Sequence, residues 1–138
     1  MTTSPTTSAM TFPDVAEGIR NALAAYCHAL DDGRVDDIVA TFTVDGTVDI
    51  PGMGTHRGTD ALRDAYTKWK PRKPQRHLVV NTHIVEWSQT SARSISDVVF
   101  LLQGKEGWAV QVVGRYDDQL RFVDNAWRFH HRGAEFVQ

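Results

Sequence analysis

The second half of this chain contains four long segments rich in Val, Ile, Phe and Trp, and this feature restricts the possible folds most. Short polar connections separate the segments, which span 76–87, 92–102, 108–122 and 126–137. Such a series predicts a meander of antiparallel β-strands. Strands of this length exceed the usual range, so we expect strong curvature of the sheet together with β-bulges.

Helical periodicity dominates the first half. Apolar residues recur at helical spacing over 14–33, 35–42 and 59–69, and a short hairpin of 47–50 and 54–58 precedes the last helix. Three helices, a hairpin and four strands predict an α+β fold. We expect a cone-shaped α+β barrel in which three N-terminal helices pack on a strongly curved, mostly antiparallel sheet. A curved sheet with helices across its open side encloses a pocket.

The length of 138 residues corresponds to a single domain. Residues 1–12 are rich in Thr, Ser and Pro and predict a disordered N-terminal segment, followed by one domain over 13–138. The N-terminal segment lacks the regions of a signal peptide, and no apolar run approaches the ~18 residues of a membrane helix. Cys27 is the only cysteine, so no intrachain disulfide forms. We therefore expect a cytoplasmic protein with no membrane contact.

Charge and motif content argue against several classes of function. Lys plus Arg total 15 and Asp plus Glu total 17, and this net charge of −2 argues against nucleic-acid binding. No glycine-rich nucleotide motif follows a predicted strand. His130 and His131 point to opposite faces of one strand, while His77 and His83 lie roughly 20 Å apart. We therefore expect neither a metal ion nor another cofactor.

Several polar side chains occupy positions where the pocket is expected. Alternation places His77 and Asn81 on one face of their strand, and Asp97 lies on an otherwise apolar face. Tyr26 lies on the apolar stripe of the first helix. Asp31 ends that helix, where the helix dipole disfavours a carboxylate unless a cationic partner is near. Four of these residues also have a purely structural interpretation. They are His77 as a surface residue, Asp97 as a partner for an Arg, Tyr26 as a core residue and Asp31 as a solvated residue.

Six short motifs occur in an order that resembles one family. They span 26–33, 42–46, 56–58, 76–81, 114–117 and 125–128. Over residues 14–132 their order and spacing resemble the SnoaL-like branch of the NTF2-like superfamily. Its members include scytalone dehydratase, bile acid dehydratase and hexachlorocyclohexane dehydrochlorinase. This fold also hosts other reactions and some proteins without catalytic activity.

The resemblance implies roles for individual residues. In the family's dehydratases and dehydrochlorinases, an Asp at the end of the first helix pairs with a His at the start of a long strand. Asp31 and His77 occupy those positions, and Tyr26 matches a Tyr of bile-acid-dehydratase-like members, where the dehydrochlorinase has Lys. The resemblance thus implies that His77, Asp31 and Tyr26 are catalytic. The residues that it implies for substrate binding are Asn81, Asp97 and Arg132.

Two segments keep alternatives open. In a regular strand Arg132 points away from Trp127, so both reach one space only if a bulge intervenes, and the alternative is a surface Arg. Residues 69–76 form a basic run. This run is either a solvated loop or a screen for anionic ligands at the rim of the pocket.

The leading hypothesis is a cofactor-independent lyase that performs a dehydratase-type elimination on a small to medium apolar substrate such as a steroid, terpenoid or polyketide. His77 would act as the base, oriented by Asp31, and Tyr26 would protonate the departing oxygen. The alternatives are an isomerase or cyclase of the ketosteroid isomerase or polyketide cyclase type, and a non-catalytic ligand-binding module. A hydrogen bond between Asp31 and His77 inside a closed pocket favours an enzyme. We also expect a homodimer or homotrimer, because small proteins of this fold often pair through the open face of the sheet.

Overall fold

The computed structural model describes residues 8–137. Its three helices are α1 (Phe12–Asp32), α2 (Val35–Ala40) and α3 (Thr59–Lys68). Thr11 caps α1 through a capping box with Asp14, and Gly33 ends the helix in the left-handed conformation with φ 68°. The three helices predicted from the apolar periodicity are therefore present.

The ordered part of the chain begins earlier than residue 13. Helix α1 starts at Phe12, and the backbone N–H and C=O of Met10 bond to the Gln89 side chain at 2.8 Å each. The predicted boundary is therefore wrong by about three residues, because the cap and this long-range contact order the chain before the helix. Residues 1–7, for which disorder was also predicted, lie outside the described residues.

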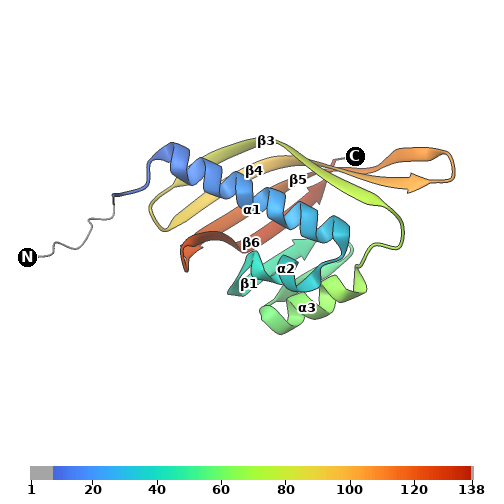
Figure 1. Ribbon diagram of the computed structural model, residues 1–138, viewed down its shortest axis with the longest axis horizontal. Coiled ribbons are helices and arrows are strands. Elements are labelled where there is room, and N and C mark those ends of the chain that lie inside the picture. The colour runs from blue at the N-terminus through green and yellow to red at the C-terminus, as the bar shows by residue number, and fades with distance from the viewer. Residues whose placement is uncertain (1–7, 138) are drawn as a thin grey trace, which may run out of the picture.

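All six strands form one sheet in the order β2-β1-β6-β5-β4-β3. Only β1 and β6 pair in parallel, and the other neighbours are antiparallel. The sheet is mixed and does not close, since β2 and β3 form its two edges. Figure 1 shows α1 lying across one face of this curved sheet, with α2 and α3 beside β1. The strands are β1 (Phe42–Ile50), β2 (Gly54–Arg57), β3 (Gln75–Trp87), β4 (Ser91–Gly104), β5 (Gly107–Val123) and β6 (Ala126–Phe136).

Bulges interrupt the long strands, as their length predicts. The pairing register shifts in β3 between Val80 and His83, and in β6 between Phe129 and His131. Each shift changes which side chains face α1, because one extra residue reverses the alternation beyond it. These two bulges determine the orientation of two predicted site residues, Asn81 and Arg132.

The hydrophobic core lies between α1 and the inner face of the sheet. The apolar stripe of α1 contributes Val15, Ile19 and Tyr26, none of them more than 1% exposed, and the sheet contributes Leu120 and Phe129, both fully buried. Toward α3 the helices and strands separate, and the core gives way to a cavity. Within residues 8–137, no helix is long and apolar enough to cross a membrane.

Candidate active site

A cavity of about 440 Å³ opens between α1, α3 and the inner face of the sheet. Its wall is mainly apolar and carries no Asp, Glu, Lys or Arg side chain. Met53 and Phe136 belong to the wall and are 40% and 42% exposed, so the cavity is open at one end rather than closed as expected. The lining residues that the chemistry below uses are Tyr26, Tyr66, Trp69, Gln75, His77, Phe100 and Tyr116.

Asp31 and His77 form a hydrogen-bonded pair at the wall of this cavity. The Asp31 Oδ1 atom lies 2.7 Å from His77 Nδ1, and the backbone N–H of His77 donates to Oδ2 at 2.8 Å. Gln75 Nε2 donates to Oδ1 at 3.2 Å. The two side chains are only 6% and 14% exposed, respectively. Helix α1 and the first residues of β3 therefore hold the carboxylate through three hydrogen bonds.

This geometry determines the tautomer of His77. An ionised carboxylate only accepts hydrogen bonds, so Nδ1 carries the proton and Nε2 of a neutral ring is free to accept one. The ring stacks on Phe100, with centroids 4.5 Å apart and planes at 23°. Packing and hydrogen bonding thus hold the imidazole in one orientation at the cavity wall.

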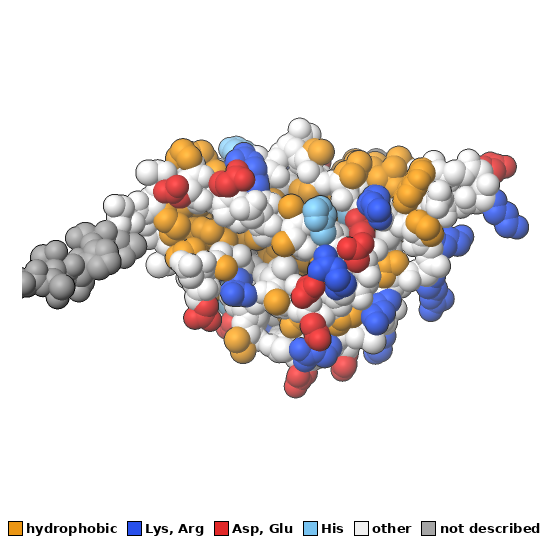
Figure 2. Space-filling view, viewed as in Figure 1, with side chains coloured by type: hydrophobic (Ala, Val, Ile, Leu, Met, Phe, Trp, Pro, Cys, Tyr) orange, Lys and Arg blue, Asp and Glu red, His pale blue; other side chains and the backbone are white. Residues whose placement is uncertain are grey.

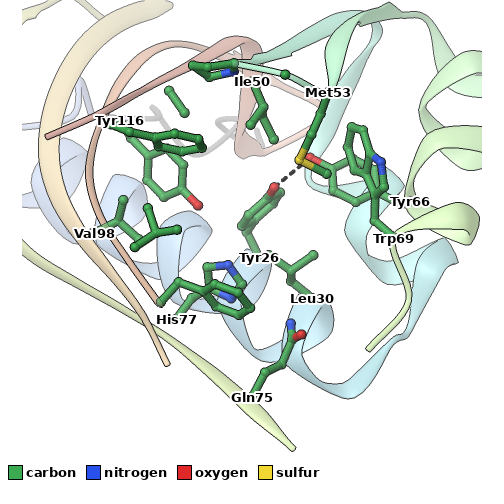
Figure 3. Close-up of a pocket in the computed structure, with 16 residues that line it drawn as sticks. Tyr26, Leu30, Ile50, Met53, Tyr66, Trp69, Gln75, His77, Val98 and Tyr116 are labelled. Atoms are coloured by element: carbon green, nitrogen blue, oxygen red, sulfur yellow. Dashed lines mark hydrogen bonds between the residues drawn. The ribbon is translucent and has the colours of Figure 1, made fainter. Parts of the chain in front are cut away.

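The three tyrosines of the chain all line the cavity. The hydroxyls of Tyr26 and Tyr66 are 2.6 Å apart, and Figure 3 shows Tyr26 between His77 and Tyr66. Burial raises the pKa of both phenols well above the ordinary value. Both hydroxyls therefore stay protonated at neutral pH. Whichever one donates to the other, the accepting hydroxyl keeps a proton to offer to a ligand.

Arg132 lies behind the cavity wall rather than in it. Its guanidinium donates to the Asp118 carboxylate from Nε at 3.0 Å and from Nη2 at 3.3 Å, and both side chains are fully buried. It also stacks over the rings of Tyr116, Tyr26 and Phe129, at 3.6, 4.2 and 4.4 Å from their centroids. Three aromatic rings and an ion pair therefore surround its guanidinium, and Arg132 does not line the cavity where substrate contact was predicted.

The bulge in β6 explains the inward orientation of Arg132. Trp127 and Phe129 face the interior, and the extra residue at His130 returns Arg132 to the same side. Regular alternation predicted that Trp127 and Arg132 reach one space only if a bulge lies between them. The structure contains this bulge. The alternative of a surface Arg is excluded, because Arg132 is 0% exposed.

Asn81 and Asp97 do not line the cavity, and Asp97 lies on the opposite face of the sheet. Ser96 and Val98 point inwards and are buried, so Asp97 between them points outwards. Asn81 sits in the β3 bulge with φ 54°, and its Nδ2 donates to Asp97 Oδ2 at 2.9 Å. Arg115 donates to the other oxygen at 3.2 Å. These bonds, first that from Asn81 and then that from Arg115, lower the pKa of Asp97. Neither residue lines the cavity, so their predicted substrate contacts remain predictions.

Among the cavity residues that were not predicted as site residues are Tyr66, Tyr116 and Gln75, whose side chains can form hydrogen bonds. Tyr66 lies on the apolar side of α3, where a sequence pattern indicates packing rather than function. Gln75 precedes His77 by two residues, and their shared strand face is the signal that could have paired it with Asp31. Within residues 8–137, no group of three or more His, Cys, Asp or Glu side chains is placed to hold a metal ion.

Comparisons with known proteins place this architecture in context. Similar solved structures include a protein of unknown function from Mycobacterium tuberculosis, with 25% identity, a TM-score of 0.84, and coverage of 90% of this chain and 77% of that one. A proposed scytalone dehydratase from Novosphingobium aromaticivorans shares 22% identity at a TM-score of 0.80, over 94% of this chain and 89% of that one. The dehydrochlorinase LinA shares 20% identity at a TM-score of 0.78, over 90% and 86%.

Sequence comparison agrees with the structural one. No curated protein sequence matches the chain. A family model does match it, that of the SnoaL-like domain, over residues 14–133. This match spans every helix and strand described above except the first residues of α1 and the end of β6. The chain therefore belongs to the SnoaL-like domain family.

Proposed function

We propose that this protein is a cofactor-independent lyase that eliminates water from a small to medium, largely apolar molecule such as a steroid, terpenoid or polyketide. The observation that carries the proposal is the 2.7 Å hydrogen bond between Asp31 and His77 at the wall of an apolar cavity. Such a pair supplies an oriented base. The hydroxyl of Tyr26 in the same cavity supplies the complementary acid.

The reaction would proceed by transfer of two protons. His77 Nε2 takes a proton from a carbon next to an activating carbonyl, and the electrons of the broken C–H bond form a C=C bond. The adjacent C–O bond breaks, and its oxygen takes a proton from Tyr26 and leaves as water. Asp31 stabilises the imidazolium during this step. Tyr66 stabilises the tyrosinate by donating to it, and the proton on His77 then returns to Tyr26.

Two of the similar structures support an elimination rather than another reaction. One is a proposed scytalone dehydratase and the other is a dehydrochlorinase, and both names describe eliminations. Isomerases and cyclases of this fold usually pair a carboxylate base with an oxyanion hole. Asp97, the carboxylate that could have played that part, faces away from the cavity. A binding module without catalysis has no evident need for the buried Asp31–His77 pair.

A substrate screen with a matched pair of variants tests the proposal. Alcohols of the steroid, terpenoid and polyketide classes are incubated with the protein, and mass spectrometry detects loss of one water. We expect His77→Ala to reduce turnover by about 10²–10⁴-fold. His83→Ala removes an exposed histidine of the same strand and should leave turnover unchanged. Turnover near wild type in a folded His77→Ala variant would show that the mechanism is wrong.

A further inference from the structure

A run of unpaired cations lies in the segment that contributes Trp69 and Gln75 to the cavity wall. The basic segment, residues 68–76, contains no acidic residue and carries five exposed cations: Lys68, Lys70, Arg72, Lys73 and Arg76. The chain has only four lysines, three in this segment and the fourth at position 105. This concentration of positive charge occurs in a protein whose net charge is −2.

The protein leaves this charge unneutralised. Among residues 8–137, none of the five cations forms an ion pair, whereas the arginines elsewhere in the fold mostly do. Six of these form ion pairs with aspartates, namely Arg34, Arg57, Arg63, Arg93, Arg115 and Arg132. The basic segment therefore presents a positive potential to whatever lies beside it.

The segment is fixed against the cavity wall rather than free in solvent. Trp69 and Gln75, which belong to it, line the cavity. The carbonyl of Pro74 accepts a hydrogen bond from Gln103 N–H at 3.0 Å, and Gln75 bonds to Asp31. Lys70, Arg72 and Lys73 therefore lie in the short stretch of chain between two residues of the cavity wall.

A second depression continues from the basic segment along the β4–β5 hairpin. Its volume is about 400 Å³, and Lys73 and Lys105 both contribute to its wall, with Glu106 as its one acidic residue. Figure 2 shows blue side chains gathered on the side of the molecule that carries this hairpin. The cavity itself has no charged wall residue other than the titratable His77. Residues of the basic segment therefore contribute both to the apolar cavity, through Trp69 and Gln75, and to this cationic depression, through Lys73.

We propose that the natural ligand is an amphiphilic anion, whose apolar body enters the cavity and whose carboxylate or phosphate stays outside on the basic segment. This inference rests on the proposed function for the position of the reacting group. It goes further by naming a charge that the ligand must carry. The neutral cavity wall excludes the anionic group from the interior, where a charge without a partner is costly to bury.

A simpler role for the segment makes a different prediction. Pro71 and Lys70 pack near Gly33, where α1 ends, so the cations could merely complement the negative end of the helix dipole. In that case they would stabilise the fold and have no effect on the choice of ligand. Measuring ligand choice separately from stability therefore separates the two roles.

Matched fluorescent probes test the proposal on the full chain. The probes are 4-(1-pyrenyl)butanoic acid, its uncharged amide and the corresponding pyrenylbutyl phosphate, which share one apolar body. At an ionic strength on the order of 0.01 M, we expect the acid to bind about fivefold more tightly than the amide. This ratio should approach one near 0.5 M salt, since the charges are exposed. The ratio of acid to phosphate distinguishes a carboxylate ligand from a phosphorylated one.

Two double variants with the same change of charge complete the experiment. Arg72→Ser with Lys73→Ser should abolish the preference for the acid and leave affinity for the amide unchanged. Arg20→Ser with Arg121→Ser removes two exposed cations elsewhere and should retain the preference. Equal binding of acid and amide by the wild type would overturn the inference. The same conclusion would follow if the preference survived in the first double variant.

The proposed function can fail independently of this inference. Binding of the probes requires no elimination chemistry, so an anion preference can hold in a protein that dehydrates nothing. Dehydration of uncharged alcohols with no preference for anionic probes would support the lyase and refute the anionic ligand. If none of the three probes binds, the cavity would be neither the site of the proposed elimination nor the site that takes the anionic ligand.

Discussion

Both oxygens of Asp31 accept hydrogen bonds from β3, and this arrangement fixes the ring of His77 and the start of the strand together. An amide at this position would retain one acceptor oxygen but would present an N–H₂ group where the other oxygen now accepts a hydrogen bond. In Asp31→Asn we therefore expect His77 to rotate or change tautomer, and kcat to fall by about 10²–10⁴-fold with little change in KM. Steady-state kinetics on a substrate from the screen measures the effect.

The neighbouring Asp32 provides the control for this substitution. Asp32 is exposed and pairs with Arg34 at 3.5 Å, away from His77. Asp32→Asn removes the same charge at the end of α1 and should leave kcat unchanged. An equal loss in both variants would mean that helix-end charge, rather than the hydrogen bonds to His77, is what matters.

Tyr26 and Tyr66 make separable contributions, although their hydroxyls touch. Tyr26→Phe removes the proposed acid, so we expect kcat to fall by about 10²-fold or more. Tyr66→Phe removes only the partner of that hydroxyl, and we expect a fall of about tenfold with a loss of about 1 kcal/mol in unfolding free energy. Equal losses of kcat in the two variants would contradict Tyr26 as the acid. Kinetics and denaturant titration of both variants provide the comparison.

Among the helices and strands, the sequence predicts the regular segments but not the orientation of side chains at the bulges. Helix α1 and the four long strands follow from periodicity, because side chains at helical or alternating spacing meet one core. The site residues followed from the resemblance, and two of them pair where the chain is regular: Asp31 in the last turn of α1 and His77 before the bulge in β3. Asn81 sits in that bulge, and its position cannot be derived from simple alternation.

Asp97 and Asn81 are absent from the cavity wall for different reasons. Strand β4 is regular there, so its alternation was predicted correctly, but the sequence does not reveal which face of the strand turns toward α1. Both faces of β4 carry apolar residues, because the outer face also includes Ile95 and Val99. Burying Ser94 and Ser96 on the inner face contradicts the usual preference for apolar interiors. The tertiary packing, and not the pattern, selects the face.

The contact between α1 and β6 gives a prediction about packing. A Cβ atom added at Gly18 would lie 2.5 Å from Trp127 Cδ1, closer than packed atoms approach. Gly18→Ala should therefore destabilise the fold by about 1–3 kcal/mol, even though alanine favours a helix by roughly 1 kcal/mol. Asn21→Ala, at an exposed position one turn later, should be neutral or stabilising. Thermal unfolding followed by circular dichroism compares the two variants, and a stabilised Gly18→Ala would contradict the close contact.

For the whole molecule, the outer face of the sheet provides a basis for association. Leu78, Val99 and Val113 lie in one row across β3, β4 and β5, and Leu78 and Val113 are 49% and 44% exposed. We propose that this face joins copies of the chain into a homodimer or homotrimer. Light scattering coupled to gel filtration should give two or three times the monomer mass. Val113→Glu should reduce it to the monomer mass, and a mass unaffected by Val113→Glu would place the interface elsewhere.

The three tyrosines also make the free energy of unfolding change with pH in the alkaline range. Burial raises the pKa of each phenol in the folded state, whereas in the unfolded chain each ionises near its ordinary value of about 10. Between the ordinary pKa and the raised pKa of the folded state, the unfolded state binds fewer protons than the folded state. The free energy of unfolding therefore falls as pH rises through this range. Below pH 10 the phenols contribute no pH dependence.

The size of this effect and its test follow from linkage. Three phenols that ionise only on unfolding lower the unfolding free energy by at most about 4 kcal/mol per pH unit. We therefore expect tyrosinate absorbance to appear together with the loss of circular dichroism above pH 10, and the slope in Tyr116→Phe to fall by about one third. Tyrosinate absorbance at its ordinary pH in a protein that keeps its circular dichroism would mean that the phenols are accessible to solvent, and would contradict their burial in the cavity wall.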